Sequence, residues 1–155
     1  MADTIQSVLI GGVAGLVSAM LTHFSTRAKL RLDLAAEYDK KLQENRLEAY
    51  KELWAMLEPL AKYGRGKVTY NILQRVSDSS RAWYFQTGGI YLTERSRKPY
   101  FDWKGALQGL IDNPKLAREP ELEVEIKLLE PVIQTGSVLR TALSDDIGTK
   151  RLSRI

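Results

Sequence analysis

The 155-residue chain contains no cysteine and a single histidine, His23. Without cysteine it can form no disulfide, zinc–thiolate site or iron–sulfur cluster, and it has no thiol nucleophile. Histidines and paired carboxylates commonly act as catalytic acids and bases, and the one adjacent carboxylate pair is Asp145 and Asp146. No metal-ligand spacing accompanies that pair. We therefore expect no enzyme, cofactor or metal, and we expect the pair to lie in a solvated turn or to meet Lys150, Arg151 or another protomer.

Fixed charges are absent from Thr4 to Thr26, and residues 5–24 supply the roughly 20 residues that cross a bilayer. A cleaved signal peptide would begin with positive charge, whereas the only early charge here is Asp3. The first basic residues follow the apolar run, and such residues stay in the cytoplasm. The sequence predicts a transmembrane anchor over 1–26 in the bacterial inner (cytoplasmic) membrane, single-pass, with the N-terminus out and the C-terminal domain in the cytoplasm. The alternative is a buried helix of a soluble protein. The flanking residues are Arg27, Lys29 and Arg31.

Small residues recur every four positions along the anchor and form one stripe on a helix. Membrane helices associate through such stripes because small side chains let the two backbones approach closely. We expect a homo-oligomer or a pairing with a partner membrane protein. His23, at the cytoplasmic end, is expected to reach the lipid headgroups; the alternative is a proton-sensitive group in a pore. The predicted helix–helix interface comprises Ser7, Gly11, Gly15 and Ala19.

The remainder is predicted to be all-α. No glycine or proline occurs between Leu16 and Met56, so one helix is expected to run from the anchor until Pro59 ends it. Further helices are expected over 67–85, from Pro99 to Asn113, and from near Pro120 to Leu143. Residues 122–128 alternate as a strand would, but their glutamates favour a helix. The expected architecture is a cytoplasmic bundle of about four helices over 27–144, followed by a basic tail over 145–155. Its predicted aromatic core comprises Trp83, Phe85, Tyr100 and Trp103.

Basic residues gather between Lys62 and Lys104, where aromatic residues are interleaved with them. One interpretation is contact with anionic lipid headgroups. A second is a nucleotide or nucleic acid, whose bases stack on rings while arginines hold phosphates. A third is charge pairing with acidic faces of other subunits. The candidate contacts are Arg65, Lys67, Arg81, Arg95, Arg97 and Lys98.

Three segments, RLEAYKELWAMLEPL, WYFQTGGIYL and LRTALSDDIGTKR, resemble patterns in uncharacterised prokaryotic single-pass membrane proteins with a helical cytoplasmic domain. The resemblance implies a prokaryotic or phage origin and the same architecture, and it transfers no functional residue. The favoured hypothesis is a membrane-anchored, oligomerising helical scaffold, adaptor or small membrane effector that acts with partner proteins. The alternative is a membrane-tethered sensor that binds a nucleotide messenger or nucleic acid through the basic and aromatic residues.

Overall fold

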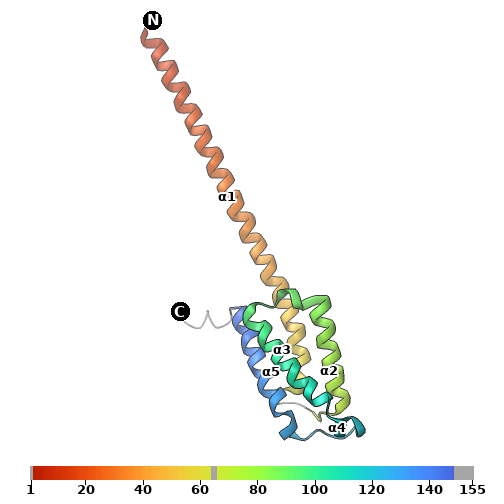
Figure 1. The fold of residues 1–155 in the computed structure, drawn as a ribbon. Coiled ribbons are helices and arrows are strands. Elements are labelled where there is room, and N and C mark those ends of the chain that lie inside the picture. Colours follow the sequence, from red (N-terminus) through yellow and green to blue (C-terminus); the bar gives the residue numbers. More distant parts are fainter. Residues whose placement is uncertain (1, 64–65, 149–155) are drawn as a thin grey trace. The chain divides into compact units, whose positions relative to one another are not determined.

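The computed structural model describes the backbone of residues 2–63 and 66–148. It does not describe the side chains of residues 2–22, 24, 25 and 28. Within these limits the chain is all-helical, which confirms the predicted class (Figure 1). The elements are α1 (Ala2–Leu57), the 3₁₀ turn η1 (Glu58–Leu60), α2 (Tyr70–Trp83), the π-helical turn η2 (Tyr84–Gly88), the 3₁₀ turn η3 (Gly89–Tyr91), α3 (Glu94–Ile111), α4 (Pro114–Arg118) and α5 (Ile126–Asp146).

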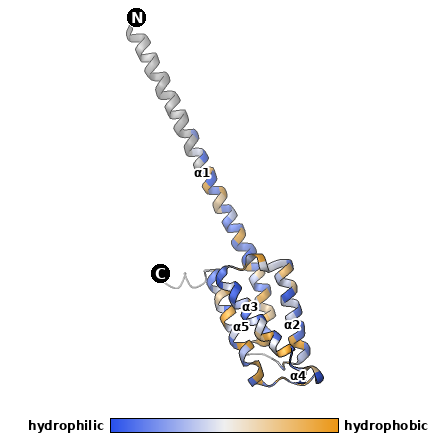
Figure 2. Cartoon of the chain, in the orientation of Figure 1, coloured by the Kyte–Doolittle hydropathy of each residue, from blue (hydrophilic) through white to orange (hydrophobic). Residues whose placement is uncertain are grey.

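The chain divides into two units, Met1–Leu42 and Gln43–Ile155. In the first unit the side chains of residues 29–41 are all exposed, and hydrophilic and hydrophobic residues alternate along this stretch (Figure 2). Among the described residues, no helix combines the length and the apolar character that crossing a bilayer requires. Most side chains of the predicted anchor lie outside the described part of the structure. So do all those of the predicted interface, Ser7, Gly11, Gly15 and Ala19.

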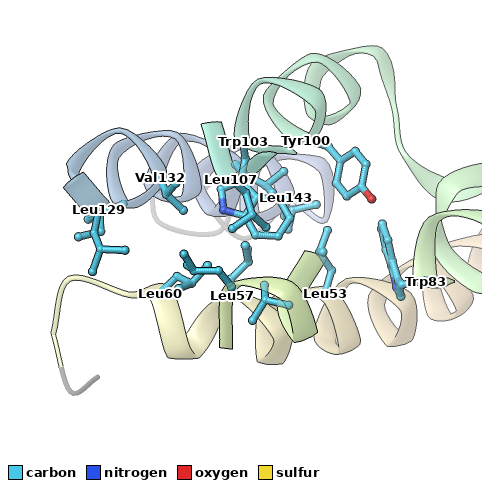
Figure 3. Close-up of a cluster of buried hydrophobic side chains, with 14 of the residues drawn as sticks. Leu53, Leu57, Leu60, Trp83, Tyr100, Trp103, Leu107, Leu129, Val132 and Leu143 are labelled. Atoms are coloured by element: carbon cyan, nitrogen blue, oxygen red, sulfur yellow. The ribbon is translucent and has the colours of Figure 1, made fainter. Parts of the chain in front are cut away.

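The second unit is a bundle built from the last turns of α1 together with α2, α3 and α5, which confirms the predicted bundle of about four helices. Its core side chains all fall between Ala49 and Leu143. Leu53, Leu57 and Leu60 of α1 and η1 face Trp103 and Leu107 of α3 together with side chains of α5 (Figure 3). Burial of this apolar surface is the main force that stabilises the bundle.

Helix α1 ends as predicted, because Pro59 lies directly after it in η1. The prediction for α3 was wrong, since that helix begins at Glu94 and contains Pro99 in its interior. The Thr93 Oγ1 accepts a hydrogen bond from the Arg95 N–H at 3.2 Å, and the Ser96 Oγ accepts one from the Thr93 N–H at 3.1 Å. These reciprocal caps satisfy N–H groups at the start of the helix and fix its first turn upstream of the proline.

The predicted start of the last helix near Pro120 was also wrong, since α5 begins at Ile126. Residues 119–122 form a turn, in which the Leu122 N–H donates to the Glu119 carbonyl at 3.0 Å, and Glu123 then forms an isolated antiparallel bridge with Thr69. The Val124 N–H donates to the Val68 carbonyl at 2.8 Å. Val124 is buried whereas its neighbours Glu123 and Glu125 are exposed, as an extended segment with alternating sides requires. The alternation of residues 123–125 therefore reflects local extended structure.

Three of the four predicted core aromatics are buried, namely Trp83, Tyr100 and Trp103. Phe85 is 78% exposed, which contradicts its predicted place in the core. It lies in η2, where the wider π-helical turn changes the angular spacing that an α-helical pattern assumes. Gly88 permits this turn because a Cβ at that position would overlap the Trp83 indole.

Candidate functional site

A polar cluster joins three helices at one end of the bundle. The Tyr50 hydroxyl of α1 lies 2.8 Å from the Asp146 Oδ2 of α5 and 2.9 Å from the Tyr91 carbonyl oxygen. The Thr93 hydroxyl, at the start of α3, donates to the same carboxylate, 2.7 Å from Oδ1. Ser96 Oγ completes the cluster at 3.3 Å from the Tyr50 hydroxyl. Asp146 does not lie in a solvated turn, because it is half-buried and accepts hydrogen bonds from Tyr50 of α1 and from Thr93 at the start of α3; Lys150 and Arg151 lie outside the described residues.

The electrostatics of this cluster suit a structural role. Burial raises the pKa of Tyr50 to about 12, and the Asp146 carboxylate raises that pKa further while the hydrogen bond with Ser96 lowers it. At neutral pH Tyr50 is therefore a protonated donor facing an acceptor, and it holds no proton that it would readily release. An open polar hollow of about 690 Å³ adjoins the cluster and is lined by Gln43, Thr93, Glu94, Arg95 and Asp145–Gly148.

A cluster of aromatic rings lies between the end of α2 and the start of α3. The Tyr84 ring stacks on the Tyr100 ring, with centroids 5.2 Å apart and planes 15° from parallel. Phe85 and Phe101 each pack edge-on against Tyr84, at 5.2 and 5.3 Å. Phe101 is 50% exposed, so together with Phe85 it presents ring surface to solvent. We call these four residues, Tyr84, Phe85, Tyr100 and Phe101, the aromatic face.

The predicted basic residues divide between the two ends of the bundle. Arg81 lies in the last turn of α2, while Arg95, Arg97 and Lys98 lie in the first turns of α3, so these four share the end that carries the aromatic face. Lys67 precedes α2 by three residues and lines a different hollow beside Glu123. Because α2 has 14 residues, Lys67 is on the order of 20 Å from Arg81. Arg65 lies outside the described residues.

These cations differ in how they are held. Lys98 Nζ forms an ion pair with Asp102 at 2.6 Å, and Arg97 Nη2 donates to the Leu92 carbonyl at 3.4 Å. Arg81 lines a small hollow of about 390 Å³ with Asp78 and Phe85. Arg81 is thus a cation beside an exposed ring, whereas the charge of Lys98 is compensated within its own helix.

Lys104 is a further cation whose structural position the sequence did not reveal. Its ammonium group donates to the Ser77 carbonyl and hydroxyl oxygens, both at 2.9 Å, and to the Ser80 hydroxyl at 3.2 Å. Burial lowers the pKa of Lys104, which Asp78 partly offsets. Lys104 therefore links α3 to α2 through Ser77 and Ser80.

No protein-family model, curated protein or solved structure matches this chain. Within residues 2–63 and 66–148, no group of three or more histidines and carboxylates is arranged to hold a metal ion. The aromatic face is the surface at which predicted aromatic and basic residues meet.

Proposed function

We propose that the chain is a membrane-anchored helical adaptor that docks a partner protein through the aromatic face. The uncharged run from Thr4 to Thr26, followed by basic residues, supports the anchor and the inner-membrane orientation. The second unit supplies its own core between Ala49 and Leu143, as a docking module requires. No catalytic role is part of this proposal.

The proposal rests on the exposure of Phe85 and Phe101, whose rings are held in place by contacts with other aromatic rings. Both rings pack against Tyr84, which is stacked on the buried Tyr100. The Tyr100 hydroxyl in turn donates to the Ser80 carbonyl at 2.8 Å. Aromatic residues held this way lose little conformational entropy on binding, and such anchors dominate the energetics of protein interfaces.

Site-specific photocrosslinking in bacterial cells tests the docking surface. A benzoylphenylalanine placed at Phe85 or Phe101 of the full chain is expected to give one discrete adduct. The matched control is Leu122, which is 61% exposed and belongs to the turn between α4 and α5, at the other end of the bundle. Equal adducts from all three positions, or none from Phe85 and Phe101, would contradict the proposal.

Self-association through the anchor is a separate part of the proposal. Replacing both Gly11 and Gly15 with leucine fills the small-residue stripe with bulky side chains and is expected to dissociate the oligomer in detergent. Val13→Leu is the matched control, because residue 13 lies on the opposite side of the helix from residue 11. Light scattering measures the mass, and an unchanged mass in the double variant would remove self-association from the proposal.

The second candidate function is binding of a nucleotide or a single-stranded nucleic acid. It is favoured by Arg81, which lines a hollow with the exposed Phe85, and by Arg97, one helical turn before Phe101. Full-length chain in detergent is titrated with a labelled oligothymidylate at low and high salt. Binding that falls steeply with salt and is lost in Arg81→Gln/Arg97→Gln, but kept in Lys67→Gln, supports it. Absence of binding at low salt would reject it.

A further inference from the structure

A groove on another side of the bundle runs between α1 and α5. It encloses about 790 Å³, within the range of ligand sites in proteins. One wall is formed by Trp54 and Ala55 of α1 together with Glu58 of η1, and the α5 wall extends from Glu130 to Arg140. The aromatic face lies on η2 and α3, so the groove is a distinct surface. The groove residues are Trp54, Ala55, Glu58, Ala61, Lys62, Tyr63, Glu130, Ile133, Gln134, Ser137 and Arg140.

Arg140 is the unusual charge in this groove. Among the described residues its guanidinium has no hydrogen-bond or ion-pair partner, although the side chain is half-buried. Burial lowers the pKa of Arg140, as expected for a cation that has lost water. Taking such a group out of water is costly unless a partner is supplied. A carboxylate that binds both arms of the guanidinium would supply one.

The surroundings of Arg140 define what accompanies that carboxylate. Helices α1 and α5 are antiparallel with Tyr50 beside Asp146, so Trp54 lies at the same end of the groove as Arg140. Trp54 is 46% exposed, and Ile133 lies nearly buried in the α5 wall. Gly136 leaves room next to the guanidinium, because a Cβ there would be 3.8 Å from Arg140 Nη1 and 3.5 Å from Trp103 Nε1. That indole N–H is buried and has no acceptor within the described chain.

The other end of the groove has a different character. Glu130, ten residues before Arg140, accepts a hydrogen bond from Gln134 at 3.0 Å. Lys62 lies over the Tyr63 ring at 5.5 Å from its centroid. Ten helical residues span about 15 Å, which is the length of roughly five residues of extended peptide. One end of the groove therefore carries Arg140 and Trp54, and the other end carries Glu130 and Lys62. The distance between the two ends is about the length of a short peptide.

We infer that the α1–α5 groove binds an extended peptide segment of a partner protein, in which a carboxylate meets Arg140 and a neighbouring apolar side chain packs on Trp54. The unpartnered, half-buried guanidinium and the half-exposed indole at one end of the groove select this ligand. The inference does not rest on the anchor or on the aromatic face.

A selection experiment with the full chain in detergent tests the ligand class. A random heptapeptide library on phage is panned on the wild-type protein and counter-panned on Arg140→Gln. Peptides with Asp or Glu next to a leucine or an aromatic residue are expected to be enriched. Enrichment of peptides without a carboxylate, or the absence of any enrichment, would overturn the inference.

Synthetic copies of the enriched peptides then give affinities. Trp54 is the one tryptophan of the three that is substantially exposed, so binding is expected to change the tryptophan emission. Arg140→Gln should weaken binding at least about tenfold, the loss expected for one charge-assisted pair, and Arg140→Lys should weaken it less. Arg118→Gln, in α4, is the matched control and should bind like wild type. Equal affinity in Arg140→Gln and wild type would overturn the inference.

Two further measurements exclude a folding artefact and other occupants. Circular dichroism is expected to give the same melting curve for Arg140→Gln and wild type, because that side chain has no partner to lose. Should Arg140→Gln unfold, Trp54→Ala replaces it as the test variant and must also abolish peptide binding. Binding of anionic phosphatidylglycerol vesicles that displaces the peptide from the wild type, and that is itself lost in Arg140→Gln, would assign the groove to lipid and overturn the inference.

Discussion

The Tyr50 hydroxyl and the Asp146 carboxylate lie 2.8 Å apart although 96 residues separate them in the sequence. This contact joins the first and last helices of the bundle, and the Thr93 hydroxyl joins the start of α3 to the same carboxylate. When a buried donor loses its acceptor, the folded state is destabilised by the free energy of removing that donor from water. The contact therefore makes the end of α5 part of the folded unit.

A double-mutant cycle measures this contact. Tyr50→Phe and Asp146→Asn are each expected to lower the free energy of unfolding by about 1–3 kcal/mol, because each removes the hydrogen bond between a buried hydroxyl and a carboxylate. The double variant should be less destabilised than the sum, with a coupling of roughly 1 kcal/mol or more. Urea titration followed by circular dichroism gives the four values. Simple additivity would contradict the contact.

Stability is expected to fall between about pH 10 and pH 12. Burial raises the pKa values of Tyr50 and Tyr100 to about 12, from an ordinary value near 10. Above pH 10 the unfolded chain loses these protons while the folded chain keeps them, so rising pH favours unfolding. Each tyrosine contributes up to about 1.4 kcal/mol per pH unit in this interval, and the contribution is fully present below pH 10.

Tyr100→Phe isolates one of these contributions. The variant lacks the hydrogen bond to Ser80 at every pH, so the informative quantity is the change in unfolding free energy between pH 9 and pH 11.5. That change should be smaller in Tyr100→Phe than in wild type. An equal change would show that Tyr100 ionises at the same pH in both states.

Two glycine substitutions are expected to have opposite signs. Gly88→Ala places a Cβ on the Trp83 indole, which donates to the Ala49 carbonyl at 3.0 Å, and it should cost about 3 kcal/mol or more. Gly105→Ala lies in the exposed interior of α3 with open space around the new Cβ. It should stabilise the protein by about 0.5–1 kcal/mol. Thermal unfolding measures both, and destabilisation by Gly105→Ala would contradict the assigned geometry.

Tryptophan quenching offers a direct check of burial. Trp83 and Trp103 are 2% and 0% exposed, whereas Trp54 is 46% exposed. Acrylamide should therefore quench a single class of tryptophan in the wild type, and Trp54→Phe should remove almost all of that quenching. Persistent strong quenching in Trp54→Phe would show that the core is open.

Local patterns predicted the parts of the fold that depend on neighbouring residues. The absence of glycine and proline between Leu16 and Met56 predicted one long helix that Pro59 ends, and α1 runs without interruption to Leu57. The start of α3 was missed because Pro99 is a strong signal for a first turn, whereas the actual cap is made by Thr93 with Ser96 in place of the usual glutamate or glutamine.

The remaining errors concern contacts between distant residues. Nothing near Asp146 indicates that Tyr50 and Thr93 are its donors, because they come from two other helices. The exposure of Phe85 depends on the π-helical turn, which follows from packing of Gly88 against Trp83. The basic residues, by contrast, were grouped by sequence proximity alone, and α2 separates Lys67 from Arg81 by its whole length.

The two ends of the bundle are closed by different chemistry. At one end the helices are joined by the hydrogen bond between the side chains of Tyr50 and Asp146. Ionisation of Tyr50 or a single substitution can break that bond. At the other end Val68 and Val124 pair through backbone atoms, beside the bridge between Thr69 and Glu123. A backbone pair can keep its hydrogen bond with any side chain at position 124 except that of proline, which has no N–H. The amide of Val124 should thus resist hydrogen exchange under alkaline conditions that already loosen the opposite end.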